Sequence, residues 1–94
     1  MKRNIGKHTP KAEVKANILA HLAKHARTYR TCSPASAIGR AAYPGYNFKR
    51  SQGAALSVRL VLYEMERDGL ISHWMDDFRK GYYITTVGLA EATT

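Results

Sequence analysis

The spacing of apolar residues changes at Gly69. Upstream of this glycine, apolar residues recur three or four positions apart, as Val14 and Ile18 do, which is the period of an α-helix packed on one face. Downstream, the segments 70–75 and 82–86 are rich in aromatic and β-branched residues, as strands are. The sequence therefore predicts an α+β chain in which helices come first and a β-hairpin follows.

Two helices are predicted by a repeated start signal. Thr9-Pro10 and Ser33-Pro34 each pair a capping residue with a proline, which is tolerated at the first helical position because no backbone donor is needed there. The first signal opens a helix of about 17 residues with one apolar stripe. The second opens a shorter helix over 34–42, which the Tyr-Pro-Gly turn that follows brings to an end.

A third helix is expected over about 48–68. Asn47 or Ser51 can cap its start, and Gly69 suits the left-handed backbone that often follows a helix. Placing its residues at 100° intervals gives one apolar face that is expected to pack on the core. This inward face consists of Ala54, Val58, Val61, Leu62 and Met65.

Three helices followed by a two-stranded hairpin is the element order of a winged helix-turn-helix. A chain of 94 residues can make one compact domain with one modest core, so we expect a single domain over 9–94 and a flexible basic arm over 1–8. The polar segment 76–81 is expected to be the turn of the wing. In such folds the second helix of the motif enters the major groove of DNA, which is about 12 Å wide.

Two motifs resemble parts of MarR-like and PadR-like winged-helix regulators. Residues 58–71 (VRLVLYEMERDGLI) are similar to the junction between the recognition helix and the wing of those families, and residues 81–88 (GYYITTVG) resemble the return strand of the wing. The resemblance implies a winged helix that binds DNA. It does not include the long terminal dimerisation helices of those families, so it implies neither dimerisation nor ligand sensing. The small size suggests a regulator of a phage, a plasmid or an archaeal virus or other mobile element.

Positive charge is concentrated in one half of the chain. The formal net charge is +8, and no carboxylate lies between Val14 and Tyr63, a stretch that holds eight lysines and arginines. This pattern favours a polyanionic partner, with a generically basic protein as the alternative. Duplex DNA is preferred over RNA because a helix fits the wide DNA groove better than the narrow groove of A-form RNA.

The outward face of the third predicted helix carries the main candidate contacts. Arg59 can make two hydrogen bonds to guanine, Gln52 can pair with adenine, and Leu56 can touch a thymine methyl group. Cations near the helix start suit phosphates. With one cation from the second helix and two from the wing, the candidate DNA-binding residues are Arg40, Lys49, Arg50, Ser51, Gln52, Leu56, Arg59, Tyr63, Arg79 and Lys80.

The predicted wing and arm add further cations. Arg79 and Lys80 are placed at the hairpin tip, from which a wing reaches the minor groove or adjacent phosphates. Asp76 and Asp77 partly cancel their charge, so a solvated turn is the alternative. The arm can enter a minor groove or attract DNA without specificity, through Lys2, Arg3 and Lys7.

Leu56, Leu60 and Tyr63 support a second interpretation. DNA-facing helices rarely show so much apolar surface, so these side chains are equally suited to burial beneath the arm, in a homodimer or against a protein partner. The second function considered is therefore a winged-helix protein-interaction module.

The sequence shows no catalytic motif. His21, His25 and Cys32 are the strongest set of metal ligands, but no convincing fourth ligand accompanies them, and no motif surrounds Cys32 as a nucleophile. A phosphate-binding glycine loop and a paired-carboxylate site are also absent. We expect a non-enzymatic protein with no metal, cofactor or small-molecule substrate. One cysteine and no apolar run of about 18 residues favour the cytoplasm, at the nucleoid in a prokaryote, and no membrane.

Overall fold

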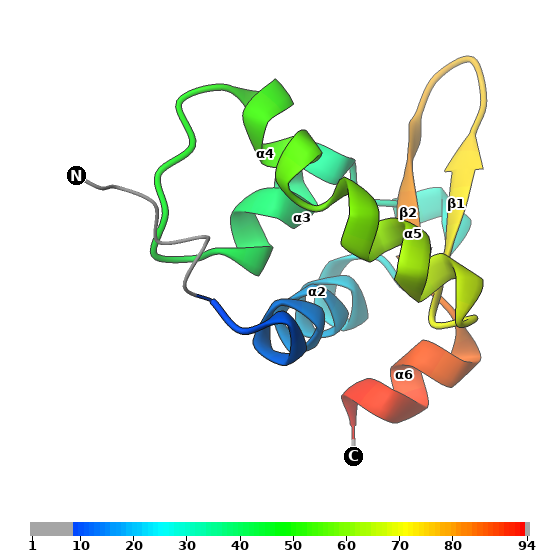
Figure 1. Cartoon of the computed structure of the whole chain (residues 1–94). Helices are drawn as coiled ribbons and strands as arrows, with labels where there is room; N and C mark the ends of the chain where they lie inside the picture. The colour runs from blue at the N-terminus through cyan, green and yellow to red at the C-terminus, as the bar shows by residue number, and fades with distance from the viewer. Residues whose placement is uncertain (1–8, 94) are drawn as a thin grey trace.

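The computed structural model describes residues 9–93, so the predicted arm with Lys2, Arg3 and Lys7 lies outside the described residues. The described part contains five α-helices, one short 3-10 turn and a two-stranded antiparallel sheet (Figure 1). The α+β class, with the hairpin after helices, is confirmed. In chain order the elements are α2 (Lys11–His25), η1 (Tyr29–Thr31), α3 (Ala35–Ala42), α4 (Ser51–Ser57), α5 (Arg59–Arg67), β1 (Ile71–Met75), β2 (Lys80–Ile84) and α6 (Thr86–Ala92).

The core lies between α2, α3, α5 and the base of the hairpin. Burying one large aliphatic side chain stabilises a fold by about 1.5–3 kcal/mol. The elements that contribute buried aliphatic side chains to this core therefore hold one another in place. Of the predicted inward face of 48–68, Val61 is half-buried and the other four residues are buried. The largest fully buried side chains are Ile18, Leu22, Ile38, Val58, Leu62, Met65 and Ile71.

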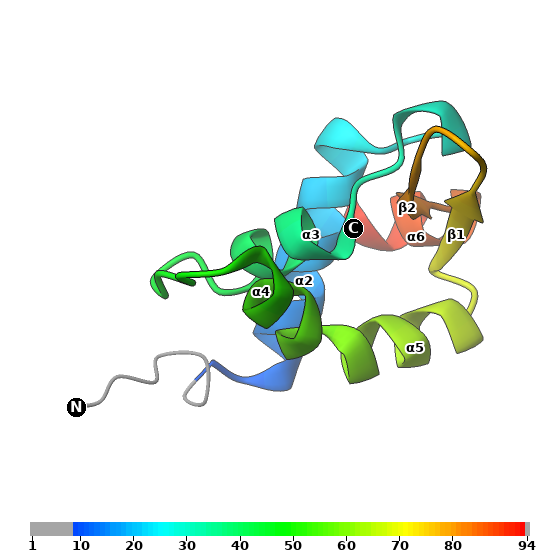
Figure 2. The ribbon, with the colours of Figure 1, turned by 90° about the horizontal axis from the view of Figure 1, so that it is seen from above.

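The molecule has two distinct sides. α2 and α6 pack together on one side, whereas α4 and the tip of the hairpin project to the other, at the top of Figure 1. Figure 2 looks down on that second side, and α4 and the hairpin stand in front of α2 and α6. α4 and the hairpin tip are therefore open to the same partner.

The prediction of one continuous helix over about 48–68 is wrong. The chain turns at Val58 (φ −111°, ψ 2°), which separates α4 from α5. Two hydroxyl groups stabilise the turn: Ser57 Oγ donates to the carbonyl of Ala54 at 2.6 Å, and Tyr43 Oη donates to the carbonyl of Ser57 at 3.4 Å. Because hydroxyl groups satisfy these carbonyls and serine back-bonding bends helices, two shorter helices replace one long one.

α3 and α4 cross at Gly39. This residue is buried, and a Cβ added to it would lie 2.0 Å from the carbonyl oxygen of Ala54 and 2.6 Å from the carbonyl carbon. The obstacle is helix backbone and not the end of a flexible side chain. The close approach of the two helices therefore requires a residue without a side chain at this position.

The predicted helix caps are displaced by one residue. Pro10 and Pro34 occupy the cap positions of α2 and α3, and neither cap has a side-chain hydrogen bond. Ser33 is used differently, because its backbone exchanges two 2.8 Å hydrogen bonds with Tyr82 of β2 and its Oγ lies 2.9 Å from Nε2 of His21. Ser33 therefore connects α2, the start of α3 and the hairpin.

The burial of His21 predicts that stability depends on pH. Burial, and then the neighbouring His25, lower the pKa of His21 below its ordinary value of 6.5. The unfolded chain therefore binds the proton more tightly, so stability is complete above pH 6.5 and declines as pH falls through the lowered pKa. We expect a lower urea midpoint at about pH 5.5 than at about pH 7.5, and His21→Gln should flatten this difference. Equal midpoints in the native protein would contradict the prediction.

The hairpin is shorter at its turn than predicted. β1 and β2 pair from Ile71 opposite Ile84 to Met75 opposite Lys80, so the turn covers 76–79 and not 76–81. Gly69 has φ +80°, the left-handed backbone predicted after the helix. α6, which the three-helix prediction omitted, is capped by Thr85. Within 9–93 no helix has the length and apolar character needed to cross a membrane.

Candidate nucleic-acid interface

The outward faces of α4 and α5 are exposed, as predicted. Leu56, Leu60 and Tyr63 expose 57%, 68% and 64% of their surface, and together with Arg59 they line a shallow hollow of about 440 Å³. In this chain, therefore, the apolar residues of the face are not buried by the rest of the described fold. The exposed candidate residues here are Lys49, Arg50, Ser51, Gln52, Leu56, Arg59 and Tyr63.

The cations of this face are uncommitted. Within residues 9–93 the side chains of Lys49, Arg50 and Arg59 form no hydrogen bond or ion pair, and the same holds for Gln52. A cation without an internal partner keeps its full charge and all its donors for a ligand. These four side chains are therefore available for an external acceptor.

The glutamates of α5 are paired with other elements. Glu64 Oε1 accepts from Lys11 Nζ of α2 at 2.6 Å, and this bond, with the charge of Lys15, holds the pKa of Glu64 below its usual value. Glu66 pairs with Nδ1 of His73 on β1. Both glutamates of α5 thus have partners on other elements, Glu64 on α2 and Glu66 on β1. Lys49, Arg50 and Arg59, on the outward face that α4 shares with α5, have none within the described chain.

Arg40 has a structural role that the sequence did not indicate. Its Nη1 donates to the carbonyl of Phe48 at 3.2 Å, and its Nη2 donates to Oγ of Ser51 at 3.4 Å. The ring of Phe48 also contacts the rings of Tyr43 and Tyr46, at centroid distances of 6.2 and 4.6 Å. Arg40 therefore positions the segment that enters α4 in addition to contributing charge.

The wing cations do not lie as predicted. Lys80 is the first residue of β2 and not part of the tip, and its side chain has no partner within 9–93. Arg79 lies in the turn, but its Nη1 donates to the carbonyl of Arg30 in η1. The sequence could not indicate this contact, because it joins residues 49 positions apart. One of the two predicted wing cations is therefore partly committed to the fold.

Asp76 organises the turn itself. Its carboxylate accepts from the indole Nε1 of Trp74 at 3.0 Å and from the backbone N–H groups of Phe78 and Arg79, both at 2.8 Å. These three hydrogen bonds, the indole bond first, hold the pKa of Asp76 below its ordinary value. The carboxylate of Asp76 thus has its partners within the turn, and of the two acids of this turn only Asp77 has a side chain without a partner in the described chain.

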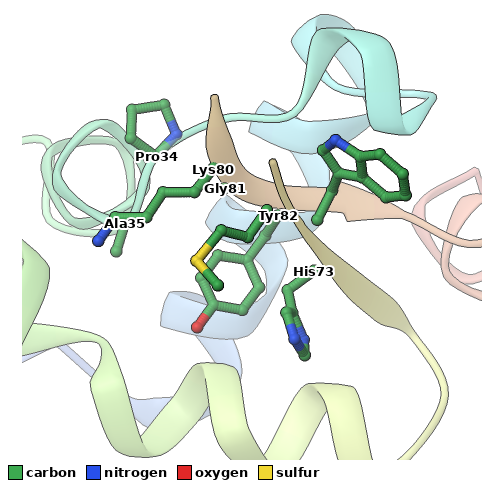
Figure 3. A pocket seen from close by; sticks show the side chains of 8 residues that line it. Pro34, Ala35, His73, Lys80, Gly81 and Tyr82 are labelled. Carbon is green, nitrogen blue, oxygen red and sulfur yellow. The ribbon is translucent and has the colours of Figure 1, made fainter. Parts of the chain in front are cut away.

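A groove of about 400 Å³ separates the hairpin from the start of α3. Figure 3 shows the rings of His73 and Tyr82 on one wall, 6.2 Å apart between centroids, and Pro34 and Ala35 on the other. Burial, and then the charge of Glu66, raise the pKa of Tyr82, which keeps its hydroxyl protonated. The lining residues are Pro34, Ala35, His73, Trp74, Met75, Lys80, Gly81 and Tyr82.

No protein-family model, curated protein or solved structure matches this chain.

The strongest set of potential metal ligands in the sequence is not brought together in the structure. Among residues 9–93, no three His, Cys, Asp or Glu side chains are placed to hold a metal ion, so His21, His25 and Cys32 do not form a site. The imidazole of His21 instead contacts the ring of His25, at a centroid distance of 5.0 Å, and Oγ of Ser33. On the described surface, the groups best able to bind a ligand are therefore the cations of the α4 and α5 region and of β2 that have no partner within residues 9–93.

Proposed function

We propose that this protein binds duplex DNA as a winged helix-turn-helix and that it regulates transcription. α3 with α4 and α5 forms the helix-turn-helix, and the hairpin of β1 and β2 forms the wing. The observation that carries the proposal is the exposed surface of residues 49–63, a stretch without a carboxylate, on which Lys49, Arg50 and Arg59 have no partner within the described chain. We also propose that the protein is cytoplasmic and has no enzymatic activity.

The bend at Val58 defines how the motif would read DNA. α4 has seven residues and is therefore about 10 Å long, close to the width of the major groove of about 12 Å. α4 would lie in the groove with Gln52 and Leu56 toward the base edges, and Arg59 would reach them from the first turn of α5. Lys49 and Arg50 would contact the phosphates that border the groove.

The salt dependence of binding tests this proposal. Three cations that each neutralise one phosphate give a slope of about −2.7 in a plot of log affinity against log salt, so affinity should fall about 40-fold between about 50 and 200 mM salt. The measurement is fluorescence anisotropy of a labelled duplex of about 30 base pairs. Absence of saturable binding at low salt would rule the proposal out.

The apolar hollow on α4 and α5 supports a second candidate function, docking of a protein partner or of a second copy of the chain. More than half of the surface of Leu56, Leu60 and Tyr63 is exposed, which is typical of contact residues. Light scattering combined with the duplex titration separates the two functions. A docking module would self-associate or await its partner, and its affinity for duplexes would not exceed that of any polycation of equal charge.

A further inference from the structure

Phe78 is the most exposed large apolar side chain of the described residues, with 92% of its surface open. It lies in the turn between β1 and β2, on the side of the molecule to which α4 also projects (Figures 1 and 2). Among the described residues, no aromatic ring or cation contacts its ring. Exposing an aromatic ring to this extent is unfavourable in water, so a surface that covers it is the natural explanation.

The turn that carries Phe78 is held rigidly. The carboxylate of Asp76 accepts hydrogen bonds from the N–H groups of Phe78 and Arg79, and the N–H of Asp76 donates to the carbonyl of Arg79 at 2.8 Å. The second oxygen of Asp76 is fixed by the indole of Trp74. A side chain presented by such a turn loses little further freedom when it binds, so its contact area is converted into affinity efficiently.

The turn is also fixed to the body of the protein. The guanidinium of Arg79 donates to the carbonyl of Arg30, and the rings of Tyr29 and Trp74 contact each other at a tilt of 44°, with centroids 4.6 Å apart. The guanidinium of Arg30 in turn lies over Tyr29, 5.8 Å from the ring centroid. The hairpin tip cannot swing away from η1 without breaking these contacts, so Phe78 is a fixed projection.

We propose that Phe78 inserts between two base pairs in the minor groove beside the segment contacted by α4, and that it kinks the duplex there. This inference rests on the proposed DNA binding. Apolar side chains that protrude beside cations are the wedges with which proteins unstack a base step and bend DNA. Lys80, uncommitted and close to the turn, would hold the phosphate backbone next to the inserted ring.

Two end-labelled duplexes of about 30 base pairs test the wedge, one with central TA steps, which unstack easily, and one with a stiff A-tract. Anisotropy measures affinity and energy transfer between the ends measures bending. The native protein should prefer the TA duplex and bring its ends closer. Phe78→Ala should bind the TA duplex about tenfold more weakly, abolish the bend and leave binding to the A-tract duplex unchanged.

Two control variants distinguish the loss of an inserted side chain from a general effect of substitution on folding. Phe78→Leu retains an apolar wedge and should retain part of the bend. Val87→Ala removes an apolar side chain that is 60% exposed but lies in α6, away from the hairpin turn, and should change neither affinity nor bending. If the native protein binds both duplexes equally and bends neither, or if Phe78→Ala behaves like the native protein, the wedge is overturned and DNA binding stands. If the native protein binds neither duplex, both proposals fail.

Discussion

Replacing Gly39 with alanine is expected to destabilise the protein by at least about 2 kcal/mol, because the new methyl group collides with backbone. The added Cβ would lie 2.0 Å from the carbonyl oxygen of Ala54, and no rotamer change relieves a clash with a helix carbonyl. α3 and α4 would have to separate, which would loosen the buried contacts of Ile38. The measurement is urea unfolding followed by far-ultraviolet circular dichroism, compared at the extrapolated free energy of unfolding.

Gly53→Ala is the matched control for this prediction. Gly53 lies within α4, and a Cβ added there meets nothing within 4 Å. The same chemical change should therefore stabilise the protein by about 0.5–1 kcal/mol, since alanine is the better helix former. If the two variants changed stability by the same amount, the close crossing of α3 and α4 would not be present in solution.

Reversing the charge of Lys49 and Arg50 together is expected to weaken binding to any duplex by about 100-fold or more at low salt. Both side chains are exposed and unpaired within the described residues, so Lys49→Glu/Arg50→Glu breaks no described contact inside the protein. Two attractive phosphate contacts become repulsive, and the salt slope should become shallower by about two units. Anisotropy titrations at several salt concentrations give both quantities.

A second double variant, Lys24→Glu/Arg27→Glu, changes the net charge by the same amount. Lys24 is near the end of α2 and Arg27 follows that helix, on the side of the molecule away from the segment that enters α4 (Figures 1 and 2). The proposed interface predicts that this variant loses only the modest affinity due to overall charge. An equal loss in both variants would mean that DNA is attracted by the whole polycation and that no one face binds it.

The fold was predictable where local sequence decides it. Apolar residues at helical spacing located α2, and the inward residues Ala54, Val58, Leu62 and Met65 are buried in the structure. The sequence did not indicate the bend at Val58, because one of the two hydroxyl groups that stabilise it belongs to Tyr43, 14 positions before Ser57. Local periodicity continues through such a bend without a visible break.

In the candidate site, too, local pattern predicted some features, and contacts between distant residues decided the others. The exposure of Lys49, Gln52 and Arg59 followed from the outward side of the helical pattern, since a residue opposite an apolar stripe is usually solvated. The commitments of Arg40 and Arg79 did not follow, because their acceptors are carbonyl and hydroxyl oxygens that only the folded chain brings near. Charge counts therefore overstated the number of cations free to bind a ligand.

The pairing of Ser33 with Tyr82 has a mechanical consequence. Gly81 lies so close to this bridge that an added Cβ would be 2.5 Å from the carbonyl oxygen of Ser33, which leaves the hairpin no room to slide past the start of α3. The helical and hairpin parts of the proposed interface are then held at a fixed separation. Under the proposed function, a bound duplex would have to adapt its own shape to that separation, and DNA sequences that deform easily would be bound more tightly.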